Sequence, residues 1–247
     1  MISTKDIKRI KALGQKKFRD QEGVFVVEGE KLVQEARESG FRIRECYRAD
    51  EIGREAMERI SQLSSPSPVL AVVEKPENWE KPLGGASIGP GLYLALDGIR
   101  DPGNLGTILR TADWFSLSGV FASPDTVEIT NPKVVQSTMG AIFRVKYFKA
   151  DIPALCRAVK ADGGEVYGTF LNGDNLYGAE LCTGRDRPVL IVIGNEANGI
   201  SKETAAETNR RITIPAGAGS KAESLNAAVA TAITVAQFHR ALCQEKE

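Results

Sequence analysis

The residues most able to do chemistry fall in three short stretches of the second half of this 247-residue chain. Asn104 and Arg110 lie in DPGNLGTILR, Glu196 lies in GNEANG, and Ser224 and Asn226 lie in SLN. An arginine stays protonated at physiological pH, so it is suited to hold a phosphate or a carboxylate. Asparagine and serine supply neutral hydrogen bonds, and glycine lets the main chain approach a ligand closely. The three stretches predict a nearly uncharged pocket beside an arginine that binds an anion.

Each stretch follows an apolar run that is typical of a buried parallel strand. These runs cover residues 92–96, 189–193 and 212–214. The remaining expected strands are 119–122, 145–148 and 166–170, and the expected helices are 105–115, 133–142, 153–161, 202–208 and 224–243. Such alternation predicts an α/β fold whose parallel sheet is covered on both faces. Ligands bind beyond the carboxyl ends of parallel strands, so we expect the three stretches to converge on one crevice.

The first 75 residues predict a separate, smaller α/β domain. Helical spacing covers residues 4–13, 31–38 and 51–62, and strand-like runs cover residues 24–27, 42–47 and 69–73. Residues 76–90 are rich in proline and glycine and are interpreted as a linker. We therefore expect one domain at 1–75 and a second at 91–247.

Composition and charge narrow the class of protein. The chain has 32 basic and 32 acidic residues, and no apolar run approaches the length of a membrane span, so we expect a cytoplasmic globular protein. Its four cysteines are far apart without metal-ligand spacing, which predicts free thiols. Lys16, Lys17 and Arg19 belong to a basic N-terminal segment. This segment fits either RNA phosphates or a solvated helix face, and charge alone does not choose between them.

Several familiar ligands and reactions fit the three stretches poorly. The run from Gly217 to Ala222 has the spacing of a dinucleotide fingerprint, but the acidic second strand that this fingerprint requires is missing. Ser224 and His239 lie fifteen residues apart on one expected helix, about 22 Å along its axis, too far to share a proton. Asp97 and Asp101 are explained by turn and capping chemistry, and we expect no metal.

Together the three motifs resemble those of the SpoU (TrmH-like) RNA ribose 2′-O-methyltransferases, in the same order and over about residues 90–245. The first 75 residues resemble a ribosomal-protein-like substrate-binding domain, mainly through FVVEGEKL at residues 25–32. The resemblance implies the SPOUT α/β fold, with a deep trefoil knot in its parallel-sheet domain. It also implies S-adenosylmethionine as cofactor and a homodimer in which each active site is completed by the other subunit.

The resemblance further implies a role for each candidate residue. Asn104 would hold the first loop, Arg110 would contact the target phosphate or ribose, and Glu196 would order the second loop. Ser224 and Asn226 would position Arg110, the cofactor or the ribose. The implied cofactor contacts are Thr169, Gly194, Ile214 and Leu225. The expected reaction is methyl transfer to a ribose 2′-hydroxyl of structured RNA, rRNA in preference to tRNA. A methyltransferase acting on a tRNA base and a non-catalytic RNA-binding relative remain alternatives.

Overall fold

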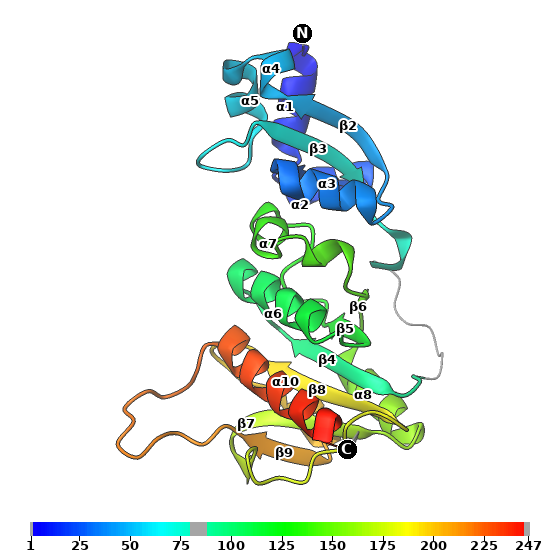
Figure 1. Ribbon diagram of the computed structural model, residues 1–247, viewed down its shortest axis with the longest axis vertical. Helices are drawn as coiled ribbons and strands as arrows, with labels where there is room; N and C mark the ends of the chain where they lie inside the picture. The colour runs from blue at the N-terminus through cyan, green and yellow to red at the C-terminus, as the bar shows by residue number, and fades with distance from the viewer. Residues whose placement is uncertain (1, 80–87, 245–247) are drawn as a thin grey trace. The chain divides into compact units, whose positions relative to one another are not determined.

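The chain divides into two compact units in its computed structural model, which describes residues 2–79 and 88–244 (Figure 1). The first unit comprises Met1–Glu77 and Glu128–Arg144, and the second comprises Asn78–Val127 and Val145–Glu247. Residues 128–144, which sequence analysis placed in the second domain, thus cluster with the first unit. Residues 80–87 of the expected linker lie outside the described residues.

The first unit combines a three-stranded sheet with short helices. Its elements from residues 2 to 77 are α1 (Thr4–Ala12), α2 (Lys16–Glu22), β1 (Val24–Glu28), α3 (Glu30–Glu38), β2 (Ile43–Arg48), α4 (Ala49–Ile52), α5 (Arg54–Ile60) and β3 (Val69–Glu74). The strand order is β1-β3-β2, with both pairs antiparallel. The helix expected at 51–62 is split at Gly53, whose φ of 89° favours glycine. Ile10 and Leu13 pack with Met57 and Ile60 in the core of this unit.

Residues 128–144 complete the first unit. This segment carries α7 (Pro132–Ser137) and the 3₁₀ turn η2 (Ala141–Phe143), and α7 packs on β1. The ring of Phe143 lies edge-on to Phe41, with centroids 5.0 Å apart, and Arg144 pairs with Glu35 at 2.6 Å. The helix expected at 133–142 ends early, because Met139 and Gly140 both have positive φ angles.

Arg19 lies inside the first unit, which corrects its expected role as an RNA contact. Its side chain donates to the carbonyl oxygens of Leu13 at 2.7 Å and Gly14 at 2.8 Å, and it pairs with Glu128. Only 1% of the residue is exposed, so no RNA can reach its guanidinium group. Arg19 therefore holds segment 128–144 and the end of α1 in place.

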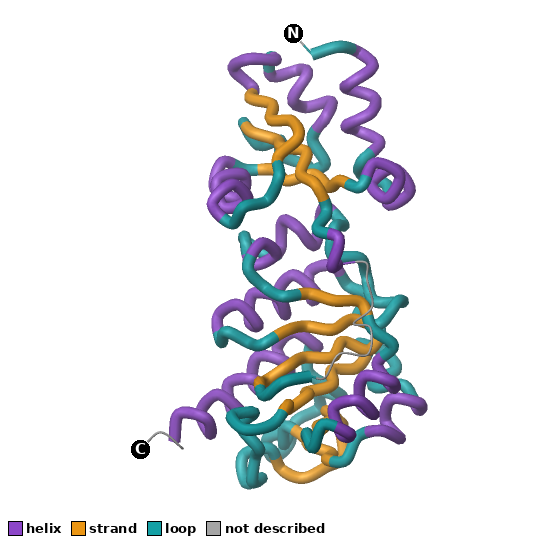
Figure 2. The backbone as a smooth tube through the Cα atoms, turned by 90° about the vertical axis from the view of Figure 1, so that its right-hand side faces the viewer, coloured by secondary structure: helices purple, strands orange, loops and turns teal. Residues whose placement is uncertain are grey.

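The second unit is a six-stranded sheet in which every neighbouring pair is parallel, as the alternating pattern predicted. The strand order is β6-β5-β4-β8-β7-β9. Its elements are η1 (Glu77–Trp79), β4 (Gly91–Asp97), α6 (Pro102–Trp114), β5 (Gly119–Ala122), β6 (Tyr147–Lys149), α8 (Ile152–Ala161), β7 (Glu165–Asn175), β8 (Pro188–Gly194), α9 (Lys202–Glu207), β9 (Arg210–Thr213) and α10 (Ala227–Gln244). Helices α6 and α10 pack together on one face, and α8 and α9 pack together on the other (Figures 1 and 2).

The ends of two helices differ from the sequence prediction because of capping. Helix α6 begins at Pro102, since Asp101 accepts a hydrogen bond from the main-chain N–H of Asn104 at 2.8 Å. Helix α10 begins at Ala227 instead of Ser224, because the side-chain oxygen of Asn226 accepts from the N–H of Ala228 at 2.9 Å. Ser224 and Leu225 therefore lie in the preceding loop. No helix in the described part of the chain is long and apolar enough to cross a bilayer.

We expect Arg19→Ala to lower the free energy of unfolding by about 3 kcal/mol, because it removes the nearer of the two cations that pair with Glu128 and leaves two carbonyl groups without their donor. Lys17→Ala removes an exposed cation of the same helix and should change stability by less than about 0.5 kcal/mol. Urea denaturation followed by circular dichroism compares the two variants. Equal losses would show that Arg19 has no special structural role.

Candidate functional site

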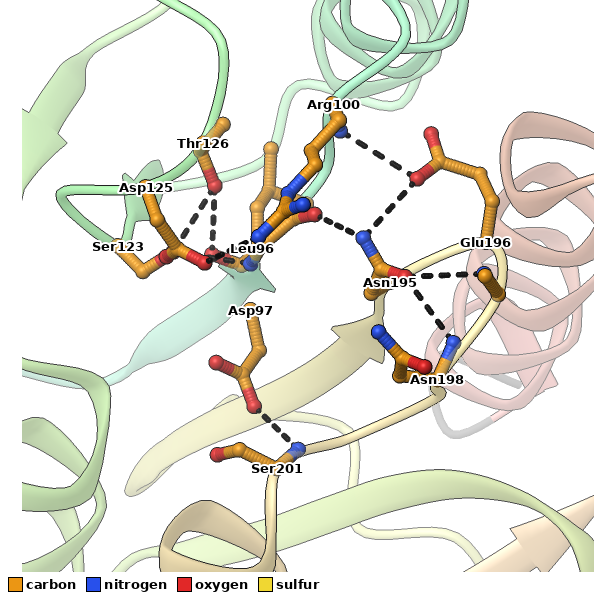
Figure 3. Close-up of polar contacts among 12 residues, drawn as sticks. Leu96, Asp97, Arg100, Ser123, Asp125, Thr126, Asn195, Glu196, Asn198 and Ser201 are labelled. Carbon is orange, nitrogen blue, oxygen red and sulfur yellow. Dashed lines mark hydrogen bonds and ion pairs between the residues drawn. The ribbon is translucent and has the colours of Figure 1, made fainter.

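The sheet brings two of the three sequence motifs side by side. Strands β4 and β8 are neighbours, and their last residues, Asp97 and Gly194, pair in register. Asp97 also accepts a hydrogen bond from the main-chain N–H of Ser201 at 2.8 Å, which fixes the chain after the β8 loop (Figure 3). Strand β9, which leads to the third motif, lies two strands further along the sheet. The expected convergence of the strand ends on one edge is therefore confirmed.

The loop from Gly194 to Gly199 is closed by its own asparagine. Asn195 and Gly199 exchange two main-chain hydrogen bonds of 2.9 Å. The side-chain oxygen of Asn195 accepts from the N–H groups of Ala197 and Asn198, at 2.9 and 3.0 Å (Figure 3). Its amide donates to the carbonyl of Gly98 at 2.6 Å, which ties this loop to the one after β4. Asn195 was not among the residues predicted from the sequence, although asparagine in a glycine-rich loop often bonds the main chain two residues on.

Gly194 is required by the close approach of this loop to itself. A Cβ atom at this position would lie 2.3 Å from the carbonyl carbon of Gly199 and 2.3 Å from the nitrogen of Ile200. Both atoms belong to the main chain, so the loop itself would have to move. Glycine at 194 therefore sets the shape of the loop.

Glu196 connects the second motif to the first. Its carboxylate accepts hydrogen bonds from the Asn104 side-chain amide at 2.9 Å and from the main-chain N–H groups of Arg100 and Asp101, both at 3.3 Å. Partial burial alone would raise the pKa of Glu196. The bonds from Asn104 and the main chain outweigh that effect and hold the pKa below its usual range. Glu196 thus stays charged and ties the second motif to the start of α6.

Asn104 connects the first motif to the third. Its side-chain oxygen accepts a hydrogen bond from the side-chain amide of Asn226 at 2.8 Å, while its own amide binds Glu196. The three residues form a continuous series, which we call the Glu196–Asn104–Asn226 chain. In the sequence, Glu196 lies 92 positions after Asn104, and Asn226 lies 122 positions after it. Asn104 is only 8% exposed, which makes these bonds costly to break.

A cavity of about 1020 Å³ lies beside this chain of hydrogen bonds. All four predicted cofactor positions line it, namely Thr169, Gly194, Ile214 and Leu225, as do Glu196 and Ser224. Its inner wall includes the buried side chains of Leu176, Ile193 and Ile212. Its rim includes loop 194–199 and residues from the exposed loop 215–225. This combination suits a flat, mostly apolar ligand with polar edges.

Two hydroxyl groups in the cavity wall can serve such a ligand. Thr169 donates to the carbonyl of Val192 at 2.9 Å, which leaves its oxygen lone pairs free to accept. Thr234 lines the wall on α10, and its buried hydroxyl has no hydrogen-bond partner within the described residues. Thr234 was not among the residues predicted from the sequence. It follows Ala227 and Ala230 on one helical face, and that spacing was the available signal.

Arg110 lies outside the cavity wall. It is exposed on α6 and forms no hydrogen bond or ion pair with any residue that the structure describes. Ser224 lines the cavity and also has no hydrogen bond within the described ranges. The structure thus joins Asn104, Glu196 and Asn226 directly and leaves Arg110 and Ser224 with free polar groups.

The remaining expected RNA contacts are on α2. Lys16 and Lys17 are both exposed, and Lys16 pairs with Asp20 and lies 3.7 Å from Glu128. The ammonium group of Lys17 lies 6.0 Å from the centroid of the Phe18 ring. The charge of Lys16 is therefore partly neutralised within the first unit, whereas Lys17 keeps its charge available.

Comparisons with known proteins cover both units. Residues 91–236 match the model of the SpoU rRNA Methylase family, and residues 4–75 match that of the MRM3-like substrate binding domain. The chain is 31% identical to the 23S rRNA (guanosine(2553)-2′-O)-methyltransferase RlmP of Bacillus subtilis, over 93% of this chain and 94% of that protein.

Solved structures agree with these matches. A structure from Porphyromonas gingivalis, described as an RNA methyltransferase of the TrmH family, is 37% identical with a TM-score of 0.85, and the match covers 97% of this chain and 99% of that one. An AdoMet-bound rRNA methyltransferase from Sinorhizobium meliloti is 30% identical with a TM-score of 0.85, over 98% and 97% of the two chains.

We expect Gly194→Ala to destabilise the protein by about 2 kcal/mol, because the added methyl group overlaps the main chain of Gly199 and Ile200. Gly217→Ala is the matched control, since a Cβ atom there meets nothing within 4 Å. Thermal unfolding of both variants measures the difference. A control that loses as much stability as Gly194→Ala would refute the steric argument.

We expect Glu196→Gln to lower the free energy of unfolding by about 1 kcal/mol at pH 7, because a neutral amide binds the three donors less well. The folded-state pKa of Glu196 is lowered, so the contribution of its charge is complete above the ordinary glutamate value of about 4.3. The contribution disappears as the pH falls through the lower folded-state value. Denaturation from pH 7 to pH 3 should show the two proteins converging in stability. A constant gap across that range would contradict this role of the charge.

Proposed function

The chain belongs to the SpoU rRNA methylase family, and from that premise we propose that it transfers a methyl group from S-adenosylmethionine to a ribose 2′-hydroxyl of ribosomal RNA. The observation that carries the proposal is the cavity at the strand ends, which the second and third motifs border and to which the Glu196–Asn104–Asn226 chain ties the first motif. The Bacillus subtilis relative, named as a 23S rRNA 2′-O-methyltransferase, supports the same reaction over nearly the whole chain.

The residues of the cavity fit S-adenosylmethionine. Ile214 and Leu225 offer apolar surface for a flat adenine ring, and the shape set by Gly194 lets main-chain groups approach the ligand. Thr169 and Thr234 offer hydroxyl groups for polar edges. The AdoMet-bound Sinorhizobium meliloti structure supports the same cofactor. When bound, S-adenosylmethionine supplies an electrophilic methyl group on a positively charged sulfur.

Arg110 is the residue we assign to the RNA. Its guanidinium group is exposed and unpaired within the described part of the chain, so it is available to a phosphate or ribose. A permanent positive charge there holds the backbone in position and stabilises negative charge that develops on the 2′-oxygen. Asn104 fixes the start of α6 through its hydrogen bonds with Glu196 and Asn226. Ser224 supplies a free hydroxyl at the cavity rim.

The proposal includes a homodimer in which the partner subunit completes each active site. Trp114, one helical turn after Arg110 on α6, is 83% exposed, and Val229 on α10 is 48% exposed. Large apolar side chains at these positions favour burial against another subunit. An Arg110 outside the cavity of its own subunit is consistent with action on RNA at the cavity of the partner.

Family membership also supports the finer features of the fold. We propose that the second unit contains the deep trefoil knot of SPOUT proteins and that the first unit is a substrate-binding domain of ribosomal-protein type. The match of residues 4–75 to the MRM3-like substrate binding domain supports that role, and the 23S rRNA methyltransferase of Bacillus subtilis favours rRNA over tRNA. We further propose that the reaction takes place in the cytoplasm, needs no metal, and uses Lys16 and Lys17 as RNA contacts.

Methyl-labelled S-adenosylmethionine with separate pools of unmodified 23S rRNA and tRNA tests the proposed function. Nucleosides from each digested pool are resolved by mass spectrometry. We expect a labelled 2′-O-methylnucleoside from the rRNA. A base-methylated nucleoside, or label in the tRNA alone, would contradict the proposal.

We expect Arg110→Ala to lower the single-turnover rate of methyl transfer at least about 100-fold, because it removes the charge that stabilises the reacting oxygen. The affinity for S-adenosylmethionine should change less than about twofold, since Arg110 does not line the cavity. Calorimetric titration with the cofactor and a rapid-quench assay separate the two effects. Equal losses of binding and rate would show that Arg110 is a structural residue.

A further inference from the structure

The first unit pairs about half of its lysines and arginines with its own carboxylates. Its cations paired with carboxylates are Arg9, Lys16, Arg19, Lys31, Arg42, Arg44, Arg48, Lys75 and Arg144. A paired cation attracts an RNA phosphate less, because the phosphate must compete with a carboxylate that is already in place. The cations without such a partner are therefore the better guide to the surface that RNA contacts.

Three cations of the first unit that pair with no carboxylate among the described residues line one hollow. A groove of about 420 Å³ between α1 and α5 is lined by Ile7, Lys8, Lys11, Ala12, Gln15 and Arg59. Among the described residues, no carboxylate lines this α1–α5 groove, and neither Lys8 nor Arg59 has a hydrogen bond or ion pair. Glu55 and Glu58 lie near Arg59 in sequence on α5 but are not part of the groove wall.

The groove is held in shape by the residues beneath it. Ile7 is 7% exposed and packs into the core with Met57 and Ile60, which fixes α1 against α5. The ammonium group of Lys11 donates to the carbonyl of Ser61 at 2.6 Å, just after α5 ends. Lys11 therefore joins the two walls and still has N–H donors left for a ligand. Lys8 and Arg59 add one free charge from each wall.

We propose that the α1–α5 groove binds the phosphate backbone of the substrate RNA. Three cations without a counter-charge, with one side-chain amide, match an anion with several acceptor oxygens. The volume exceeds that of a phosphate group alone and leaves room for an adjoining sugar. The inference rests on the proposed function for its choice of RNA. It adds an RNA contact of the first unit on α1 and α5 to the one proposed for Lys16 and Lys17 on α2.

The test uses the full-length protein and protein-free 23S rRNA in filter-binding titrations from about 50 to 300 mM KCl. Lys8→Gln and Arg59→Gln should each weaken binding about three- to tenfold at low salt. Each should also reduce the slope of log affinity against log salt concentration by about one, because one phosphate contact is lost. Arg42→Gln, which removes the same charge from a cation paired with Glu74, should leave affinity within twofold and the slope unchanged.

The outcomes separate this inference from the proposed function. If the wild-type protein methylates rRNA and the groove variants bind rRNA with the same affinity and salt slope as Arg42→Gln, the groove is not an RNA contact. The proposed reaction would still stand. If the wild-type protein binds rRNA through the groove but transfers no methyl group, the RNA contact in the groove is supported and the proposed methyl transfer is refuted. Unchanged thermal unfolding of both groove variants shows that any loss of binding comes from the missing charge.

Discussion

The candidate site depends on one series of hydrogen bonds around the buried side chain of Asn104, the Glu196–Asn104–Asn226 chain. It joins the loop after β8, the start of α6 and the start of α10, which are far apart in sequence. Each loop alone would be mobile, since glycine-rich segments lose much entropy when they are ordered. A single carboxylate that accepts from a side chain and two main-chain N–H groups offsets part of that cost. The cavity has a defined wall because these three segments are tied together.

The parallel sheet makes that chain possible. Strands β4 and β8 lie side by side with Asp97 opposite Gly194, so their loops leave the sheet at the same level. Asn195 then closes one loop on itself and binds the other through the carbonyl of Gly98. Rigid strands thus position flexible loops, and the loops carry the polar groups.

Sequence patterns predicted the sheet well, because apolar strands separated by amphipathic helices have few other ways to bury their side chains. The family resemblance implied four cofactor positions, Thr169, Gly194, Ile214 and Leu225, and the structure gathers them around one cavity. Sequence patterns failed for Arg19, because whether an arginine faces solvent depends on a partner, Glu128, more than a hundred residues away. Two further features depend on tertiary contacts and could not be predicted from the sequence. These are the place of residues 128–144 in the first unit and the free hydroxyl group of Thr234.

The most direct test of this account is a double-mutant cycle on Asn104 and Asn226, with affinity for S-adenosylmethionine as the readout. Asn104→Ala and Asn226→Ala are measured singly and together by calorimetric titration. If the side-chain bond between them holds two motifs at one cofactor site, the losses are coupled by at least about 1 kcal/mol. Strictly additive losses would mean that the two motifs shape the cavity independently, and would contradict the account.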